Sequence, residues 1–341
     1  MMIKVFIIDD VLLVRVTIKK ILSEYPDIEV IGEAPNPVDA FDVFKTTGLP
    51  DVFILDIEMP KMDGLTFLKQ IQKQKPIPTI ICSSLVTAGS SKAIDSLRFG
   101  ACDIILKPRV GLHNSIDDIS EEFITKIRAA AKSKAISSNI VAKEVSSRPL
   151  QTTDKIVGIG SSTGGVQTLE EIFVHLMPNH PPIVVVQHMP VGFTASFAFS
   201  LNNICKNSTV KEAKEGDILQ DGLILIAPGD KHMEIVRSSL DNKYFIVLKD
   251  YPKVSSHKPS VDVLFTSMAK ESKEHTVAFI LTGMGKDGAQ GIKKIKEVGG
   301  QTFGQDEKSS IVYGMPKVAF DIGGVSKQVA LDDIAGIINQ L

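Results

Sequence analysis

The feature that most constrains the fold is an alternation, repeated along the chain, of short apolar runs with segments of helical period. Between residues 3 and 130, runs such as IKVFIID, DVFILDI and TIICSS alternate with segments such as VTIKKILSEY and GLTFLKQIQK. A second series starts at KIVGIGSS and continues through PIVVVQHM and TVAFILTGM. This alternation is typical of parallel α/β sheets covered by helices on both faces. We therefore expect two doubly wound parallel-sheet domains, the second a three-layer α/β unit.

The length of the chain favours the same division. Its 341 residues exceed the usual size of one domain, so two domains can each bury a core. Between the two series lies SKAISSNIVAKEVSSRPLQTT, which is rich in Ser, Lys and Thr and has little periodicity, as expected of an exposed linker. We predict a first domain over 1–130, a linker over 131–153 and a second domain over 154–341.

The composition argues against several classes of protein. Lys and Arg number 38 against 40 Asp and Glu, which gives no basic field for nucleic acid. The start of the sequence has no export signal, and no apolar run approaches about 18 residues, so we expect a cytoplasmic protein without membrane insertion. Cys82, Cys102 and Cys205 are widely spaced and form no CxxC pair, which predicts neither a disulfide framework nor zinc.

Polar side chains follow several strands of the first domain. Asp9 and Asp10 end the first strand, Asp56 ends VFILD, Ser83 follows TIIC and Lys107 follows DIIL. Three carboxylates repel one another unless a cation neutralises them, and hard oxygen ligands suit Mg²⁺. Asp56 could then attack a phosphoryl donor while Mg²⁺ and Lys107 stabilise the transferred oxygens and Ser83 bonds to the phosphoryl group. Each residue alone could be a turn or cap, but together they predict a phosphate switch.

These motifs make residues 3–125 resemble the response-regulator receiver family, which has a flavodoxin-like fold. The matches are IIDD, ILDIEMPKMDG, the strand-end serine and the Lys-Pro pair. The resemblance implies that Asp56 is the phosphoacceptor for a histidine kinase. It also implies that Asp10 and Asp56 hold Mg²⁺ together with the Glu58 backbone, and that the Lys107–Pro108 bond is cis.

One position departs from the receiver pattern. Ile104 stands where the family usually has an aromatic switch residue, three positions before the lysine. An aromatic flip cannot then report phosphorylation. Signalling is therefore expected to run through Ser83, its loop and the interface between the domains.

The second domain opens with a serine in a glycine-rich turn. GSSTGG at 160–165 follows the strand KIVGI and precedes a helical segment, the context of a G-x-S-x-G nucleophile elbow with Ser162 at its centre. A helix cap is the simpler interpretation of such a serine. Dinucleotide binding is a further alternative, but the glycine spacing is one residue too long and the next strand ends in Gln187-His188 where an acid is expected.

Two later strand ends supply the partners that a serine nucleophile needs. His188 ends PIVVVQ and could accept the serine proton, although a single histidine is often structural. Asp287 lies in the glycine-rich turn after TVAFILTGM and could orient that imidazole, or merely cap the following helix GAQGIKKIKEV. Since all three follow strands of one domain, a serine-hydrolase triad is predicted.

Residues 154–341 resemble the catalytic domain of the chemotaxis methylesterase family (CheB), through GSSTGG, QHMPVGFT, APGDKHM, SVDVLF and LTGMGKDGA. The resemblance implies hydrolysis of γ-glutamyl methyl esters on methyl-accepting chemoreceptors, and deamidation of receptor glutamines. It also implies that Met284 contributes its backbone N–H to an oxyanion hole, that Thr163 supports the imidazole and that His232 lies on the rim. No cofactor is expected in this domain.

Regulation and two alternatives remain as hypotheses. The unphosphorylated receiver is expected to cover the Ser162 cleft, so that phosphorylation of Asp56 exposes it. The second domain could instead be a phospho-regulated adaptor that binds receptors without catalysis, or an esterase for a partner outside chemotaxis. An intact triad of Ser162, His188 and Asp287 argues against the adaptor.

Overall fold

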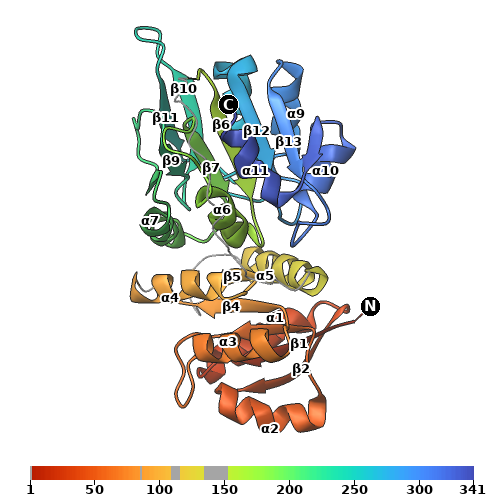
Figure 1. Cartoon of the computed structure of the whole chain (residues 1–341). Helices are drawn as coiled ribbons and strands as arrows, with labels where there is room; N and C mark the ends of the chain where they lie inside the picture. The colour runs from red at the N-terminus through yellow and green to blue at the C-terminus, as the bar shows by residue number, and fades with distance from the viewer. Residues whose placement is uncertain (1, 85–86, 109–115, 134–152) are drawn as a thin grey trace. The chain divides into compact units, whose positions relative to one another are not determined.

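The computed structural model describes residues 2–84, 87–108, 116–133 and 153–341, with only the backbone of 87–90 and 116–119 (Figure 1). The chain divides into two compact units, residues 1–138 and 139–341. This division falls inside the predicted linker, although α5 extends to Lys132, two residues into it. Residues 134–152 lie outside the described residues, so the bounds of the linker stay a prediction.

The first unit alternates strands and helices without exception. Its elements are β1 (Ile3–Ile8), α1 (Leu12–Ser23), β2 (Ile28–Ala34), α2 (Pro37–Thr47), β3 (Val52–Leu55), α3 (Gly64–Gln74), β4 (Thr79–Ser83), α4 (Thr87–Arg98), β5 (Asp103–Leu106) and α5 (Ile116–Lys132). The strands pair in parallel in the order β2-β1-β3-β4-β5, the flavodoxin-like order. The central strands are buried on both faces, which explains their continuous apolar runs.

The second unit is larger. It contains β6 (Ile156–Ser161), α6 (Gly165–Phe173), β7 (Ile183–Gln187), α7 (Phe193–Ile204), β8 (Thr209–Glu212), β9 (Leu223–Ile226), β10 (His232–Arg237), β11 (Tyr244–Lys249), α8 (Val261–Glu271), a 3₁₀ turn (Lys273–His275), β12 (Thr276–Ile280), α9 (Ala289–Glu297), β13 (Gln301–Gln305), α10 (Met315–Asp321), β14 (Lys327–Val329) and α11 (Leu331–Ile338).

Seven of these strands form one parallel sheet in the order β14-β13-β12-β6-β7-β9-β8. Alternate residues of each strand point to opposite faces, so Val184 and Val186 of β7 join a core with α8, α9 and α10. The chain adds β7 on one side of β6 and later adds β12 on the other side. The strand order therefore reverses next to β6, and such a switch point is where ligands bind in open α/β sheets. The predicted α/β fold class is confirmed.

The hairpin β10–β11 was not predicted. It forms a separate antiparallel pair, which includes the apolar run KYFIVLK and lies outside the parallel sheet expected of the second domain. An apolar run of this length does not reveal which sheet it will join, because the pattern reports burial and not pairing. Within the residues that the structure describes, no helix combines the length and apolar character needed to cross a bilayer.

Candidate active site

The three residues of the predicted triad follow three adjacent strands of the large sheet. Ser162 comes directly after β6, His188 directly after β7, and Asp287 lies in the turn between β12 and α9. Since β12, β6 and β7 are neighbours in a parallel sheet, their carboxyl ends lie side by side at one edge (Figure 1). This edge is also the switch point of the sheet. The three residues that follow strands in the sequence therefore lie together at the place where ligands bind in such sheets.

Ser162 is held in a sharp turn between β6 and α6. Its N–H donates to Thr282 O (3.0 Å), and its carbonyl accepts from Gly165 N–H (2.7 Å). Gly164 has a φ of +79°, a conformation that glycine adopts at little cost, and α6 begins at the next residue. The Ser162 side chain is mostly buried but keeps 8% exposure. This is the strand–turn–helix geometry of a nucleophile elbow.

Gln187 joins the serine turn to the end of β7. Its Oε1 accepts from the Ser161 hydroxyl (2.6 Å), and its Nε2 donates to the carbonyls of Ser162 (2.9 Å) and His188 (3.1 Å). A Cβ on Gly165 would lie 2.0 Å from Gln187 Oε1, so only glycine allows this contact. In the sequence, Gln187 stands out only as the residue at a position where a dinucleotide-binding fold would have an acid. A buried glutamine at a strand end was the available signal.

His188 and Asp287 form a buried hydrogen-bonded pair. The distance from His188 Nε2 to Asp287 Oδ2 is 2.9 Å, and the side chains are 6% and 0% exposed. The other ring nitrogen, Nδ1, is buried and has no hydrogen-bond partner among the described residues. An unsatisfied buried nitrogen is costly, and a substrate or nucleophile is a natural partner for it. The imidazole thus has one nitrogen fixed by a carboxylate and the other available.

Asp287 is bound by the N-terminus of α8. Its carboxylate accepts from the Ser260 hydroxyl (2.7 Å), Val261 N–H (2.7 Å) and Asp262 N–H (3.1 Å), in addition to His188. Burial alone would raise the pKa of Asp287, but the hydrogen bond and charge of His188, followed by the Ser260 hydroxyl, lower it to about 2. The alternative that Asp287 caps the following helix is wrong, since Gly288 occupies that N-cap without a side-chain bond.

Close packing brings α8 to this position. A Cβ on Gly160 of β6 would lie 2.2 Å from Val261 Cγ1, and one on Gly288 would lie 2.5 Å from the same atom. Two glycines therefore let the start of α8 approach β6 and the Asp287 turn. His232, expected on the rim, is fully buried, and its Nδ1 accepts from Ser260 N–H (3.2 Å). It supports the helix end that holds the carboxylate.

The ring of His188 is also covered by a residue that the sequence did not predict. His257 stacks on it, with ring centroids 3.7 Å apart and an interplanar angle of 6°. His257 belongs to the loop before α8, which has neither periodicity nor a strand-end position in the sequence. Sequence reasoning had no signal for this contact.

The predicted oxyanion residue lies against the serine. A Cβ on Gly283 would be 2.7 Å from Ser162 Cβ and 3.1 Å from Ser162 N, so the backbone leading into Met284 passes directly beside the nucleophile. Within the described residues, Met284 N–H donates no backbone hydrogen bond. Thr163 is buried, and its carbonyl accepts from Thr282 Oγ1 (3.0 Å). The roles of Met284 and Thr163 stay predictions.

The first unit brings its predicted switch residues together. Asp9, Asp10 and Asp56 each offer an oxygen, and these atoms lie within 4.8 Å of one another. Lys107 Nζ is 2.9 Å from Asp9 Oδ2 and 2.8 Å from Asp56 Oδ2. Burial raises the pKa of Asp56 to about 6, although the hydrogen bond and charge of Lys107 oppose the rise. Because ionisation of Asp56 is costly at this position, a cation bound beside it would stabilise its charged form.

The surroundings of the switch agree with the receiver pattern in part. Ser83 is buried at the end of β4, and Ile104 on β5 is 1% exposed. A cavity of about 680 Å³ lies beside the carboxylates, with Asp10 and Glu58 in its lining. The expected cis bond at Lys107–Pro108 is wrong, because the one cis peptide among the described residues is Lys258–Pro259.

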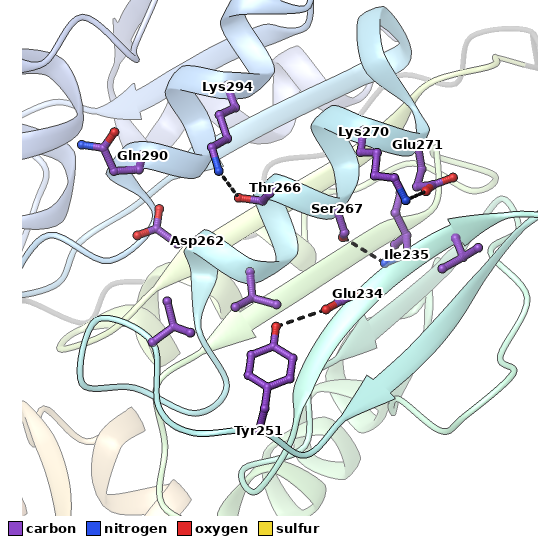
Figure 2. Close-up of a pocket in the computed structure, with 13 residues that line it drawn as sticks. Glu234, Ile235, Tyr251, Asp262, Thr266, Ser267, Lys270, Glu271, Gln290 and Lys294 are labelled. Carbon is purple, nitrogen blue, oxygen red and sulfur yellow. Dashed lines mark hydrogen bonds and ion pairs between the residues drawn. The ribbon is translucent and has the colours of Figure 1, made fainter.

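A second cavity, of about 410 Å³, lies between β10, α8 and α9 (Figure 2). Its walls carry both acidic and basic side chains, and several of these already have a hydrogen-bond partner. Tyr251 donates to Glu234, and Lys294 donates to Thr266 (Figure 2). Neither Ser162 nor His188 lines it. Hydrolytic chemistry is therefore assigned to the edge beyond β12, β6 and β7 and not to this cavity.

Comparisons with known proteins cover both units. Residues 157–338 match the family model of the CheB methylesterase, and residues 5–117 match that of the response regulator receiver domain. A protein-glutamate methylesterase/protein-glutamine glutaminase of Shewanella oneidensis is 44% identical, covering 98% of each chain. One of Leptospira interrogans is 46% identical, covering 98% of this chain and 99% of its own. The crystal structure of the Thermotoga maritima CheB methylesterase catalytic domain is 40% identical, with a TM-score of 0.53, covering 55% of this chain and 99% of that one.

The low pKa of Asp287 predicts a pH-dependent loss of stability on replacement by Asn. A carboxyl whose pKa falls on folding stabilises the protein above its unfolded value of 3.8 and loses this effect as the pH falls through about 2. Asp287→Asn should therefore lower the free energy of unfolding of the catalytic unit by about 2 kcal/mol at neutral pH. In urea denaturation, the difference in the free energy of unfolding between the parent and Asp287→Asn should decrease as the pH falls from about 4 to about 2.

The control for this series is Asp333→Asn, at an exposed position of α11. It should leave the urea midpoint of the catalytic unit nearly unchanged at each pH. If the free energies of unfolding of Asp287→Asn and the parent differ by the same amount at every pH, the charge of the Asp287 carboxylate does not stabilise the fold.

Proposed function

Because the chain belongs to the CheB methylesterase family and carries a receiver domain, we propose that it is a phosphorylation-activated protein-glutamate methylesterase. Its reaction is the hydrolysis of γ-glutamyl methyl esters on chemoreceptors in chemotactic adaptation, with release of methanol. Its relatives are named both methylesterases and glutaminases, so we extend the proposal to deamidation of receptor glutamines. The observation that carries the proposal is the buried His188–Asp287 pair beside the Ser162 turn.

In the first half of the reaction, Ser162 Oγ attacks the side-chain carbonyl of the substrate. His188 takes the serine proton through Nδ1, since Nε2 is engaged by Asp287. The imidazolium that forms lies against a carboxylate held ionised by Ser260 and the first N–H groups of α8. The pair thus favours the charge that develops on the ring.

The tetrahedral intermediate carries an oxyanion. Met284 N–H, beside Ser162, is a suitable donor for it, and the N-terminus of α6 adds a positive dipole end. Collapse of the intermediate breaks the bond to methoxide, which leaves as methanol with the proton from His188. Water then hydrolyses the acyl-enzyme by the reverse use of the same groups, giving a glutamate.

The same site can serve esters and amides. Methanol and ammonia are both small leaving groups on a side-chain acyl carbon, and each receives its proton from His188. Both reactions end in a glutamyl carboxylate. One triad therefore accounts for the two activities in the names of the relatives.

In the receiver unit we propose Asp56 as the phosphoacceptor. Asp9, Asp10 and Asp56 would hold Mg²⁺, with the Glu58 backbone nearby, and the ion would neutralise phosphoryl oxygens when bound. Lys107 already contacts Asp56 and would pair with the phosphoryl group, and Ser83 would bond to it. The donor is a histidine kinase, and the receptors and kinase imply a cytoplasmic protein.

A non-catalytic adaptor is the main alternative. An adaptor would have no use for a buried carboxylate with four donors or for a buried imidazole nitrogen without a partner. Ionisable groups with perturbed surroundings of this kind cluster at functional sites. The geometry favours an enzyme.

Replacement of Ser162 tests the proposed reaction directly. Ser162→Ala should lower methanol release from methylated receptor membranes by about 10⁴-fold or more, because the acyl-enzyme cannot form. The neighbouring Ser161→Ala is the matched control, since the Ser161 hydroxyl donates to Gln187, its one partner among the described residues. It should keep at least about a tenth of the parent rate. Equal rates for the parent and Ser162→Ala would overturn the catalytic assignment.

Replacement of Asp56 tests the switch and its metal together. A carboxyl whose pKa rises on folding destabilises the protein above that pKa, and the effect vanishes as the pH falls towards 3.8. Asp56→Asn should thus raise the melting temperature of the metal-free receiver unit at about pH 8 but not at about pH 4. Saturating Mg²⁺ should stabilise the parent and not Asp56→Asn.

Asp51→Asn is the control for this comparison, because Asp51 precedes the same strand β3 at its opposite end. It should keep both the Mg²⁺ shift and the stimulation of methanol release by a small phosphodonor. Asp56→Asn should lose both and retain the unstimulated rate. Stimulation of Asp56→Asn equal to that of the parent would contradict the assignment of the phosphoacceptor.

A further inference from the structure

The stacked contact between His257 and His188 is the unexplained feature of the site. The two rings are nearly parallel, at 6°, with centroids 3.7 Å apart. His188 is fixed at Nε2 by Asp287, and its backbone N–H donates to Ser161 O (3.0 Å). A single hydrogen bond at one nitrogen does not fix the plane of the ring. Contact with a second flat ring does, because rotation of His188 would drive its edge into His257.

The backbone that carries His257 is strained. Val254 and His257 exchange two backbone hydrogen bonds of 3.0 Å, which close a two-residue turn. Ser255 and Ser256 within it have φ values of +52° and +65°, the pattern of a type I′ turn, which favours Asn and Gly. Each non-glycine residue in this region costs about 1 kcal/mol or more, and such strain gathers at functional sites. The turn therefore holds His257 at a conformational cost.

The loop is also tied to the helix that binds Asp287. His257 Nδ1 lies 2.7 Å from Ser255 O, and the Ser255 hydroxyl donates to Asp262 Oδ2 (3.3 Å). Asp262 in turn donates its N–H to Asp287. The ring that covers His188 and the groups that donate to Asp287 are thus tied to the same segment, the start of α8.

A metal ion is an alternative use for these residues. His188, His257 and Asp287 offer ligand atoms within 4.8 Å of one another. A metal bound by an imidazole lies in the plane of its ring, however, and two parallel stacked rings share no such position. Asp287 already accepts four hydrogen bonds. The arrangement suits stacking and not coordination.

We propose that His257 is a positioning residue for the hydrolytic reaction. Its ring face fixes the plane of the His188 imidazole, which aims Nδ1 at the Ser162 hydroxyl, and supports the imidazolium that forms when the proton is taken. The inference rests on the proposed function of Ser162 and His188, and it adds a residue that touches neither the substrate nor the serine proton.

The test compares His257→Ala with His257→Phe in the full-length protein. Active sites are counted by labelling with a fluorophosphonate, so that loss of folded enzyme is separated from loss of rate. His257→Ala should lower kcat per active site for methanol release by between about tenfold and about 100-fold and leave KM within about twofold. His257→Phe restores a flat face and should recover kcat to within about fivefold of the parent. His175→Ala, a half-buried histidine on the C-terminal side of α6, should match the parent.

Two results would overturn the inference. One is a kcat per active site of His257→Ala equal to that of the parent. The other is a loss in His257→Phe as large as in His257→Ala, which would mean that the flat ring face is not what matters. If Ser162→Ala is inactive in the same assay, either result removes only the role of His257. If Ser162→Ala is active, the proposed function itself fails.

Discussion

The catalytic unit depends on one interaction, the binding of the Asp287 carboxylate by the N-terminus of α8. A buried carboxylate needs donors, and here Ser260, Val261 and Asp262 supply them at 2.7, 2.7 and 3.1 Å. With its charge stabilised in this way, Asp287 holds His188 at 2.9 Å and leaves the other ring nitrogen without a partner among the described residues. Gly160 at the end of β6 and Gly288 in the Asp287 turn let α8 approach closely enough, because a Cβ at either position would collide with Val261.

Much of the fold could be predicted because parallel sheets leave a strong pattern. Strands buried on both faces are continuous apolar runs, and the crossover helices between them have their own period. The prediction was weaker where that pattern fades. The edge strand β14 has only three residues, its neighbour β13 contains polar residues, and β10–β11 pairs apart from the main sheet. The pairing partner of a strand is a tertiary property, which local sequence does not report.

The placement of the candidate site was predictable for the same reason. Ser162, His188 and Asp287 could be expected to lie together because each follows a strand, and the carboxyl ends of neighbouring parallel strands meet. Asp287 was expected to orient His188 or to cap the next helix. It binds His188, and the helix that it caps is α8, which begins 26 residues earlier. Gln187 and His257 were missed because their contacts come from the packing of turns. No periodicity in the sequence encodes such contacts.

We propose that His188 works with Nε2 on Asp287 and Nδ1 towards Ser162. The most direct test is a crystal structure of the protein after reaction with a small alkyl fluorophosphonate. We expect phosphorus bonded to Ser162 Oγ, a phosphonyl oxygen within hydrogen-bond distance of Met284 N, and His188 Nδ1 facing the adduct while Nε2 stays on Asp287. An adduct on another residue, or an imidazole turned so that Nε2 faces Ser162, would contradict it.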